Sequence, residues 1–229
     1  MTETIVSNQE QTLSALLADR YSCRSFTPEP VPHEVIEQIL ALAQRTPSWC
    51  NTQPWQVAVT EGAATDRFRD GLAAYVRSAP QEPDLAFPRE YRGVYQDRRR
   101  ECAMALYSSV GVAGDRAASA EQTMKNFDLF GAPHVAVITT DEALGTYGAV
   151  DCGLYVTTFL LAAQSLGVAT IPQAALAGSS KYLREFFALP DDRLVVCAIS
   201  FGYPDLDHPA NNFRTTRAAV DATATWVSE

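Results

Sequence analysis

The most apolar stretch of the chain, residues 152–169, lies mostly within a predicted helix over residues 148–166, and this helix sets the strongest limit on the folds that this sequence can adopt. Its apolar side chains lie on nearly every side of a helix, and Gly167 follows as a helix-ending residue. Polar residues such as Thr157 and Gln164 interrupt the stretch, and the flanking charges of a membrane span are missing. We therefore predict a buried core helix and no membrane partner.

Length and charge narrow the class of protein further. The chain has 229 residues, of which 47% are hydrophobic and 20% charged, enough for a sizeable core. The net charge of −9 has the wrong sign for a nucleic-acid binder or a protein that binds anionic membranes. We expect one globular domain over residues 1–229 that acts on small molecules.

The cysteines and histidines are scattered and give no metal-ligand spacing. The five cysteines are Cys23, Cys50, Cys102, Cys152 and Cys197, and an odd number of isolated thiols is typical of a reducing compartment. Residues 1–11 are polar and acidic and do not resemble a signal peptide. The sequence therefore predicts a cytoplasmic protein with no metal site and a flexible segment over residues 1–11.

The order of predicted elements is that of an α+β protein. Helices are expected after Leu13 and over residues 33–43, 66–77, 91–107, 117–130, 148–166 and 180–187, and strands over 55–60, 133–139 and 194–200. Residues 46–54 and 167–173 are expected to be loops. No G-x-G-x-x-G turn or G-x-S-x-G elbow is present, which argues against a dinucleotide-binding fold of the doubly wound type and against a serine hydrolase.

Three short segments carry residue types that suit a binding site. Residues 20–26 combine two arginines with two serines, which suits a phosphate or a planar polar ring, or else a helix C-terminus. Residues 46–55 hold two tryptophans, two amides and two prolines, which suits either a rigid loop that stacks on a ligand or a simple packed turn. Residues 211–217 are basic in an acidic chain, which suits either a segment that binds a ligand or a solvated tail.

Five motifs in a fixed order resemble the nitroreductase family of FMN-dependent, NAD(P)H-using oxidoreductases. They are R-x-S-x-R-x-F at 20–26, P-S-x-x-N-x-Q-P-W at 47–55, G-x-x-x-I-P-Q at 167–173, G-Y-P-D at 202–205 and R-x-x-R at 214–217. Each motif alone is weak, but the set covers residues 13–226. Residues 79–130 match no specific pattern.

The resemblance implies a three-layer α+β sandwich with a mixed sheet flanked by helices, assembled as an intertwined homodimer. The tail, residues 205–229, is expected to cross to the partner subunit, and residues 80–130 to form a variable segment that lines the substrate channel. A dimer is also favoured because the apolar helix over 148–166 and the core-poor tail both need burial.

The resemblance also assigns residues to the cofactor. Arg20, Ser22 and Arg217 are expected to hold the FMN phosphate, with Arg214 nearby and Tyr21 in a position that is often basic in the family. Arg24 is expected beside N1 and O2 of the flavin ring, where a cation stabilises the reduced form. The residues expected beside N5 are Pro172, Gln173 and Ala174, and those expected to reach the flavin from the other subunit are Pro47, Ser48, Trp49, Asn51 and Gln53.

The substrate channel is less well defined by the sequence. Tyr91, Tyr95, Phe127 and Phe130 are candidates, although the two phenylalanines also suit an ordinary core. Five arginines lie between residues 89 and 100, either as a channel lip that favours aromatic or anionic substrates or as a solvated helix face.

The function that follows is reduction of nitroaromatic or quinone-like compounds, with FMN as cofactor and NADH or NADPH as electron donor. Hydride chemistry belongs to flavin N5, so no catalytic acid–base pair is expected, and none is visible. The alternatives are other flavin chemistry, namely O₂-dependent dehydrogenation, dehalogenation or flavin fragmentation, and a flavin-binding protein without turnover.

Overall fold

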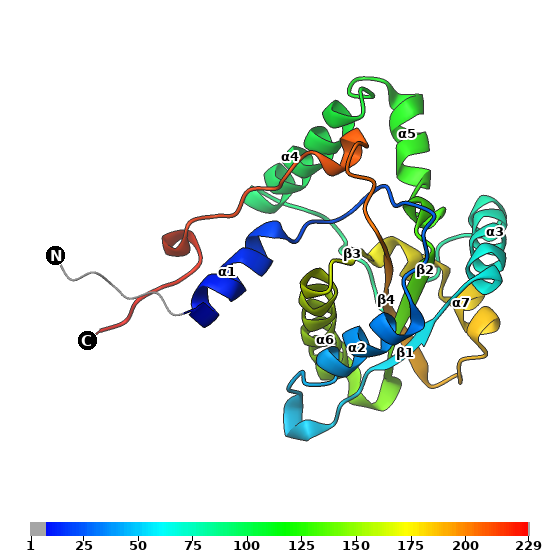
Figure 1. Ribbon diagram of the computed structural model, residues 1–229, viewed down its shortest axis with the longest axis horizontal. Helices are drawn as coiled ribbons and strands as arrows, with labels where there is room; N and C mark the ends of the chain where they lie inside the picture. Colours follow the sequence, from blue (N-terminus) through cyan, green and yellow to red (C-terminus); the bar gives the residue numbers. More distant parts are fainter. Residues whose placement is uncertain (1–7, 229) are drawn as a thin grey trace.

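A computed structural model describes residues 8–228 of the chain (Figure 1). Its helices are α1 (Asn8–Asp19), α2 (His33–Ala43), α3 (Ala63–Ser78), α4 (Val94–Ser109), α5 (Arg116–Met124), α6 (Gly145–Ser165) and α7 (Ser180–Phe187). Its strands are β1 (Gln56–Val59), β2 (His134–Asp141), β3 (Ala169–Gln173) and β4 (Arg193–Gly202). Short 3-10 turns at 49–51, 129–131, 142–144, 174–179, 209–211 and 220–222 join them.

The four strands form one sheet in the order β1-β2-β4-β3, and all three strand pairs are antiparallel. The sequence predicts a mixed sheet. In the described part of the chain, the one parallel pairing is a single bridge between Ser22 and Thr170, which extends the sheet beyond β3. The sheet is therefore antiparallel in its strands, and residues 20–26 run along its edge.

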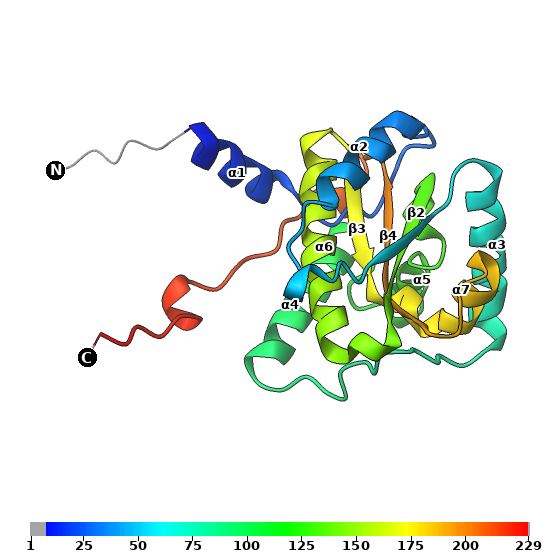
Figure 2. The same cartoon turned by 90° about the horizontal axis from the view of Figure 1, so that it is seen from below.

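Helices cover both faces of the sheet, so the predicted three-layer α+β architecture is confirmed (Figure 2). Successive side chains of a strand point to opposite faces, and β2 is buried on both. Val135 and Val137 pack in the layer with α3 and α7, whereas Ala136 and Ile138 pack in the layer with α2 and α6. The continuous apolar run of β2 follows from this position, because neither face meets water.

Several predicted boundaries are wrong for local backbone reasons. Residues 169–173, expected as a loop, are the edge strand β3, where Pro172 is tolerated because an edge strand needs fewer donors. The helix expected over 117–130 ends at Met124, and it cannot extend to residue 130 because Leu129 and Phe130 adopt positive φ angles of 55° and 53°. The helix expected from Tyr91 begins at Val94, after Gly93 with φ of 50°.

Helix α1 and the C-terminal part of the tail extend from the body of the molecule on the same side (Figures 1 and 2). None of the residues of α1 is buried, and the tail residue Trp226 is 83% exposed. Residues 1–7 of the segment expected to be flexible lie outside the described residues, and Asn8–Gln11 form the first turn of α1.

Helix α6 lies at the centre of its layer, as predicted, with Cys152, Tyr155 and Phe159 buried. Its opposite side still exposes the large apolar side chains of Tyr147, Val150 and Leu154. Between residues 8 and 228, no helix combines the length and the apolar character that crossing a bilayer requires.

Candidate functional site

Residues 20–24 and 213–217, far apart in the sequence, line one cleft of about 370 Å³. Four arginines face it, and among residues 8–228 no carboxylate does. The residues that line it are Leu17, Ala18, Arg20, Tyr21, Ser22, Arg24, Cys102, Phe213, Arg214, Thr215 and Arg217. The cleft therefore brings together every residue that the sequence assigns to a phosphate, together with Tyr21 and Arg24.

Backbone hydrogen bonds hold residues 20–26 against the sheet. The N–H of Cys23 donates to the carbonyl of Thr170 at 3.0 Å, and the N–H of Thr27 donates to Tyr203 at 2.9 Å. The extended segment can pair because it follows α1 without a helical turn and borders the free edge of β3. The side chains of Ser22 and Arg24 are thereby fixed beside the carboxyl end of β3.

The arginines of this cleft lack anionic partners. Burial lowers the pKa of Arg20, and the positive charge of Arg217 lowers it further. Burial likewise lowers the pKa of Arg24. Among residues 8–228, none of Arg20, Arg24, Arg214 and Arg217 forms an ion pair with a carboxylate. Arg20 and Arg24 are partly buried, whereas Arg214 and Arg217 are exposed. Guanidinium groups gathered without a counter-charge favour an anion, and a phosphate matches their forked donors.

Tyr21 and Arg214 form a direct contact that accounts for the tyrosine at this position. The guanidinium carbon of Arg214 lies 3.8 Å from the centre of the Tyr21 ring. Its Nη1 also donates to the carbonyl of Asn211 at 2.8 Å. The ring thus positions a cation contributed by the tail, although it supplies no charge itself.

A second cavity, of about 400 Å³, adjoins the cleft and lies between the carboxyl end of β3 and the α4–α5 hairpin. One side comprises Ser22, Arg24 and residues 171–175, and the other comprises residues of α4 and α5. Gln173 is fixed in its wall, since its Nε2 donates to the carbonyl of Asn126 at 2.8 Å and its Oε1 accepts from Ser200 Oγ. This cavity is lined by all three residues expected beside N5, namely Pro172, Gln173 and Ala174.

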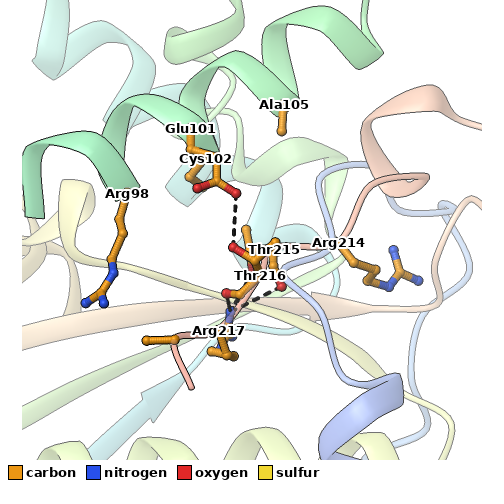
Figure 3. Close-up of a pocket in the computed structure, with 9 residues that line it drawn as sticks. Arg98, Glu101, Cys102, Ala105, Arg214, Thr215, Thr216 and Arg217 are labelled. Atoms are coloured by element: carbon orange, nitrogen blue, oxygen red, sulfur yellow. Dashed lines mark hydrogen bonds between the residues drawn. The ribbon is translucent and has the colours of Figure 1, made fainter. Parts of the chain in front are cut away.

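A third hollow, of about 340 Å³, lies where the tail passes α4 (Figure 3). Thr216 Oγ1 donates to the carboxylate of Glu101 at 3.0 Å and ties the tail to the helix. Arg217 Nη1 donates to Thr215 Oγ1 at 2.8 Å. Cys102 of α4 lines all three spaces, so α4 forms a wall that they share.

The loop at residues 46–55 lies away from the cleft, near the N-terminal part of α6. The carboxylate of Asp151 accepts a hydrogen bond from the N–H of Trp49 at 3.1 Å. The rings of Trp49 and Tyr147 pack edge to face, with 4.4 Å between their centres. Cys50, Asn51 and Gln53 all adopt positive φ, which is strained for residues other than glycine. This chain does not bring Pro47, Ser48, Trp49, Asn51 or Gln53 into the cleft.

The channel candidates separate into different environments. Phe127 and Phe130 both belong to the core between the sheet and α3, and Phe130 also lines the second cavity. Tyr95 is 67% exposed beside Arg92, and Tyr91 lies under the guanidinium of Arg99 at 5.0 Å. The cavity is also lined by residues that no sequence motif indicated, namely Leu106, Tyr107, Gln122, Thr123 and Asn126.

The cysteines are free thiols in the described chain. Burial raises the pKa of Cys23 and of Cys152 to about 11 and that of Cys197 to about 12, so these thiols stay protonated and unreactive at neutral pH. Within residues 8–228, no three side chains of His, Cys, Asp or Glu group in a way that could hold a metal ion.

The three-layer fold with an arginine-lined cleft beside its edge strand defines the class of protein. A family model described as "Nitroreductase family" matches residues 17–203, most of the chain. The chain belongs to this family.

Two curated relatives and one solved structure illustrate the similarity. Nitroreductase NfnB of Mycolicibacterium smegmatis is 34% identical over 217 residues, with 93% of this chain and 92% of the relative covered. The 4-nitrobenzoate reductase of Pseudomonas putida is 31% identical, with 89% and 90% covered. The crystal structure of the FMN-dependent nitroreductase NfnB from Mycobacterium smegmatis in complex with NADPH has a TM-score of 0.92 at 31% identity, covering 96% of this chain and 100% of that one.

Proposed function

We propose that the protein is an FMN-dependent NAD(P)H oxidoreductase that reduces nitroaromatic or quinone-like compounds. The observation that carries this proposal is the cleft, in which four arginines from two distant segments face one space without a carboxylate. The adjoining cavity, with its wall of β3, α4 and α5, provides room for planar rings. Membership in the nitroreductase family supports the same activity.

The residues of the cleft fit FMN. Arg20, Ser22 and Arg217, with Arg214 beside them, offer charge and donors to a phosphate of about −1.5 to −2 charge. Arg24 is half-buried at the boundary of the cleft and the cavity, where it would face the ring, with Pro172, Gln173 and Ala174 on the same wall. When bound, the flavin supplies hydride transfer at N5, and the protein supplies position and electrostatics.

The homodimer is part of the proposal. Leu13 and Leu17 of α1, Tyr147 and Val150 of α6, and Trp226 of the tail are large exposed apolar side chains that a second subunit would cover. The same assembly would carry Pro47, Ser48, Trp49, Asn51 and Gln53 to the partner's cleft. We expect light scattering to give a dimer at micromolar concentration, whereas a folded monomer would contradict the assembly.

Two substrates would take turns in one space. A cavity of about 400 Å³ that also holds a flavin ring leaves room for one flat molecule at a time. NADH or NADPH would bind and leave before the nitroaromatic or quinone enters, and the solved NADPH complex of the relative NfnB supports NADPH as a donor. Initial rates with both substrates varied should give parallel double-reciprocal lines, and intersecting lines would rule out this scheme.

The cofactor assignment has a direct test. Purified protein should absorb near 450 nm (about the wavelength expected for oxidised flavin), and Arg217→Ala should weaken FMN retention by about 1.5–3 kcal/mol because a bond to charged phosphate is lost. Arg77→Ala, on the distant helix α3, is the control. Equal FMN affinity of the two variants would show that the cleft is not the phosphate site.

Rapid mixing with NADH or NADPH separates the alternatives. Bleaching of the flavin supports a reductase, and its absence would favour a flavin-binding protein without turnover. We also infer a cytoplasmic location, which the free thiols of the described chain support.

A further inference from the structure

The second cavity carries a charge that the cofactor assignment does not account for. Its lining includes two cations, Arg24 and Arg99, and no aspartate or glutamate. Arg24 also lines the cleft, and its Nη1 donates to the carbonyl of Ser22 at 3.1 Å. Arg99 projects from α4 on the other side of the cavity and does not line the cleft.

Arg99 is positioned by an aromatic ring and lacks an anionic partner. Its guanidinium carbon lies 5.0 Å from the centre of the Tyr91 ring, a cation–π contact that restricts the side chain without neutralising it. Among residues 8–228 it forms no ion pair with a carboxylate, unlike its neighbour Arg92, which pairs with Glu90.

The same cavity contains a second polar group of α5, which does not face the open space. Gln122 lines the cavity, is 5% exposed, and its Nε2 is buried without a hydrogen-bond partner in the described chain. Because this nitrogen is sealed from the cavity, it offers a ligand no contact. Arg99 is therefore the group on the α4–α5 side that favours a ligand whose outer end is anionic.

We propose that Arg99 is a specificity-determining residue that selects electron acceptors bearing a carboxylate or similar anion on the aromatic ring. This inference rests on the proposed function, because the ring would lie over the flavin while its anionic substituent points toward α4. Tyr91 is the positioning residue that holds the guanidinium at the mouth of the cavity. The alternative source of an anion is the phosphate groups of the NAD(P)H donor, and the test separates the two.

The test uses FMN-loaded protein reduced with dithionite, so that no nicotinamide is present. Reoxidation is followed with 4-nitrobenzoate and with neutral 4-nitrobenzamide, which has nearly the same shape. Arg99→Gln should slow reoxidation by 4-nitrobenzoate about two- to fivefold, the range for losing an exposed charge pair, and that by the benzamide less than about 1.5-fold. Arg100→Gln, the adjacent exposed arginine that does not line the cavity, should change neither rate.

A binding measurement keeps this inference separate from the proposed activity. Benzoate and benzamide, which cannot be reduced, are titrated into the oxidised holoprotein, and the flavin spectrum reports binding. Weaker binding of benzoate alone in Arg99→Gln supports the inference even if no nitroaromatic is turned over. The inference would be overturned if Arg99→Gln weakened binding, or slowed reoxidation, equally for the charged and the neutral compound. It would also be overturned if the variant slowed reduction by NADPH but left the preference for benzoate over benzamide unchanged.

Discussion

The backbone N–H of Arg24 donates a hydrogen bond to the side-chain Oδ1 of Asn211, at a distance of 2.7 Å. Its Nδ2 donates to the carbonyls of Ser25 and Asp205, at 2.9 and 2.8 Å. Asn211 is 3% exposed, so three backbone groups depend on one buried carboxamide. This residue therefore fixes the start of the tail to the segment that carries Arg24.

Replacement of Asn211 by alanine should weaken both the fold and the cofactor site. Buried backbone groups left without a partner cost about 1–3 kcal/mol each, so we expect at least that loss in the free energy of unfolding. FMN affinity should fall as well, because the tail arginines lose their anchor. Asn212→Ala, at the exposed next position, should have little effect in denaturant titrations. Equal stability of the two variants would show that the bridge is dispensable.

The ion pair of Arg184 and Asp84 should be a strong contributor to stability. Arg184 Nη2 contacts both carboxylate oxygens of Asp84 at 2.9 Å, and Asp84 Oδ2 also accepts the N–H of Val195 at 2.8 Å. The two side chains are 22% and 15% exposed. Removing one partner of a largely buried pair strands the other charge, and we expect Asp84→Ala to cost about 2–4 kcal/mol.

The control for that variant is a surface pair. Asp66, 70% exposed, pairs with Arg69, and Asp66→Ala should cost less than about 1 kcal/mol. If chemical denaturation gives the same loss for both alanine variants, the pair with Arg184 contributes no more than a surface contact.

His134 should make the protein less stable in mild acid. Its Nε2 accepts the N–H of Val31 at 2.9 Å, and its Nδ1 lies 3.1 Å from the carbonyl of Thr60, an arrangement that requires the neutral ring. Burial lowers the pKa of His134 below its usual 6.5. The unfolded chain therefore binds a proton at a higher pH than the folded chain does.

The sign of the pH dependence follows from that difference. The contribution of His134 to stability is complete above about pH 6.5 and is lost as pH falls toward the lowered folded pKa. Urea titrations between pH 5 and 8 should show this slope, and His134→Gln should flatten it. His33→Gln should not, because the pKa of His33, exposed beside Glu61, is shifted upward instead. An unchanged slope in His134→Gln would disprove the assignment.

The loop after Trp49 should be stabilised by glycine at one position and destabilised at another. Cys50 has φ of 52°, a left-handed conformation that costs other residues about 1–2 kcal/mol. Cys50→Gly should therefore raise the free energy of unfolding by about 0.5–1 kcal/mol after the extra freedom of the unfolded glycine is subtracted. Thr52→Gly, where φ is −69°, should lower it by a similar amount. Changes of the same sign would exclude backbone strain as the cause.

The layered fold was predictable from the sequence where periodicity was strong. The apolar runs of β2, β4 and α6 and the 3.6-residue pattern of α2 are confirmed in type. Strand β3 was not predicted, because Pro172 reads as a loop residue unless one knows that this strand lies at an edge. The end of α5 was missed because residues 124–130 contain no glycine or proline to indicate a break, although Leu129 and Phe130 have positive φ.

The arginines of the cleft were identifiable because their chemistry is concentrated in short motifs. The α4–α5 side of the cavity was not, because no residue of α4 is buried, and so its sequence shows no apolar face to orient it. The arginine-rich run at 89–100, with Tyr91 and Tyr95, was the signal available there, and it did not separate Arg99 from the other exposed arginines of the run. Which arginine faces the cavity depends on how α4 crosses the tail, which a single sequence does not record.

The exposure of α1 has a consequence for biosynthesis. This helix is made before every strand of the sheet, yet none of its residues is buried, whereas β4 at the centre of the sheet is made after β1, β2 and β3. The sheet cannot close until β4 has been added between β2 and β3, so α6, the helix that α1 contacts, is not held in its layer before then. In the proposed dimer, the apolar side chains of α1 would be covered only when two finished chains meet, which makes the last step of maturation depend on protein concentration.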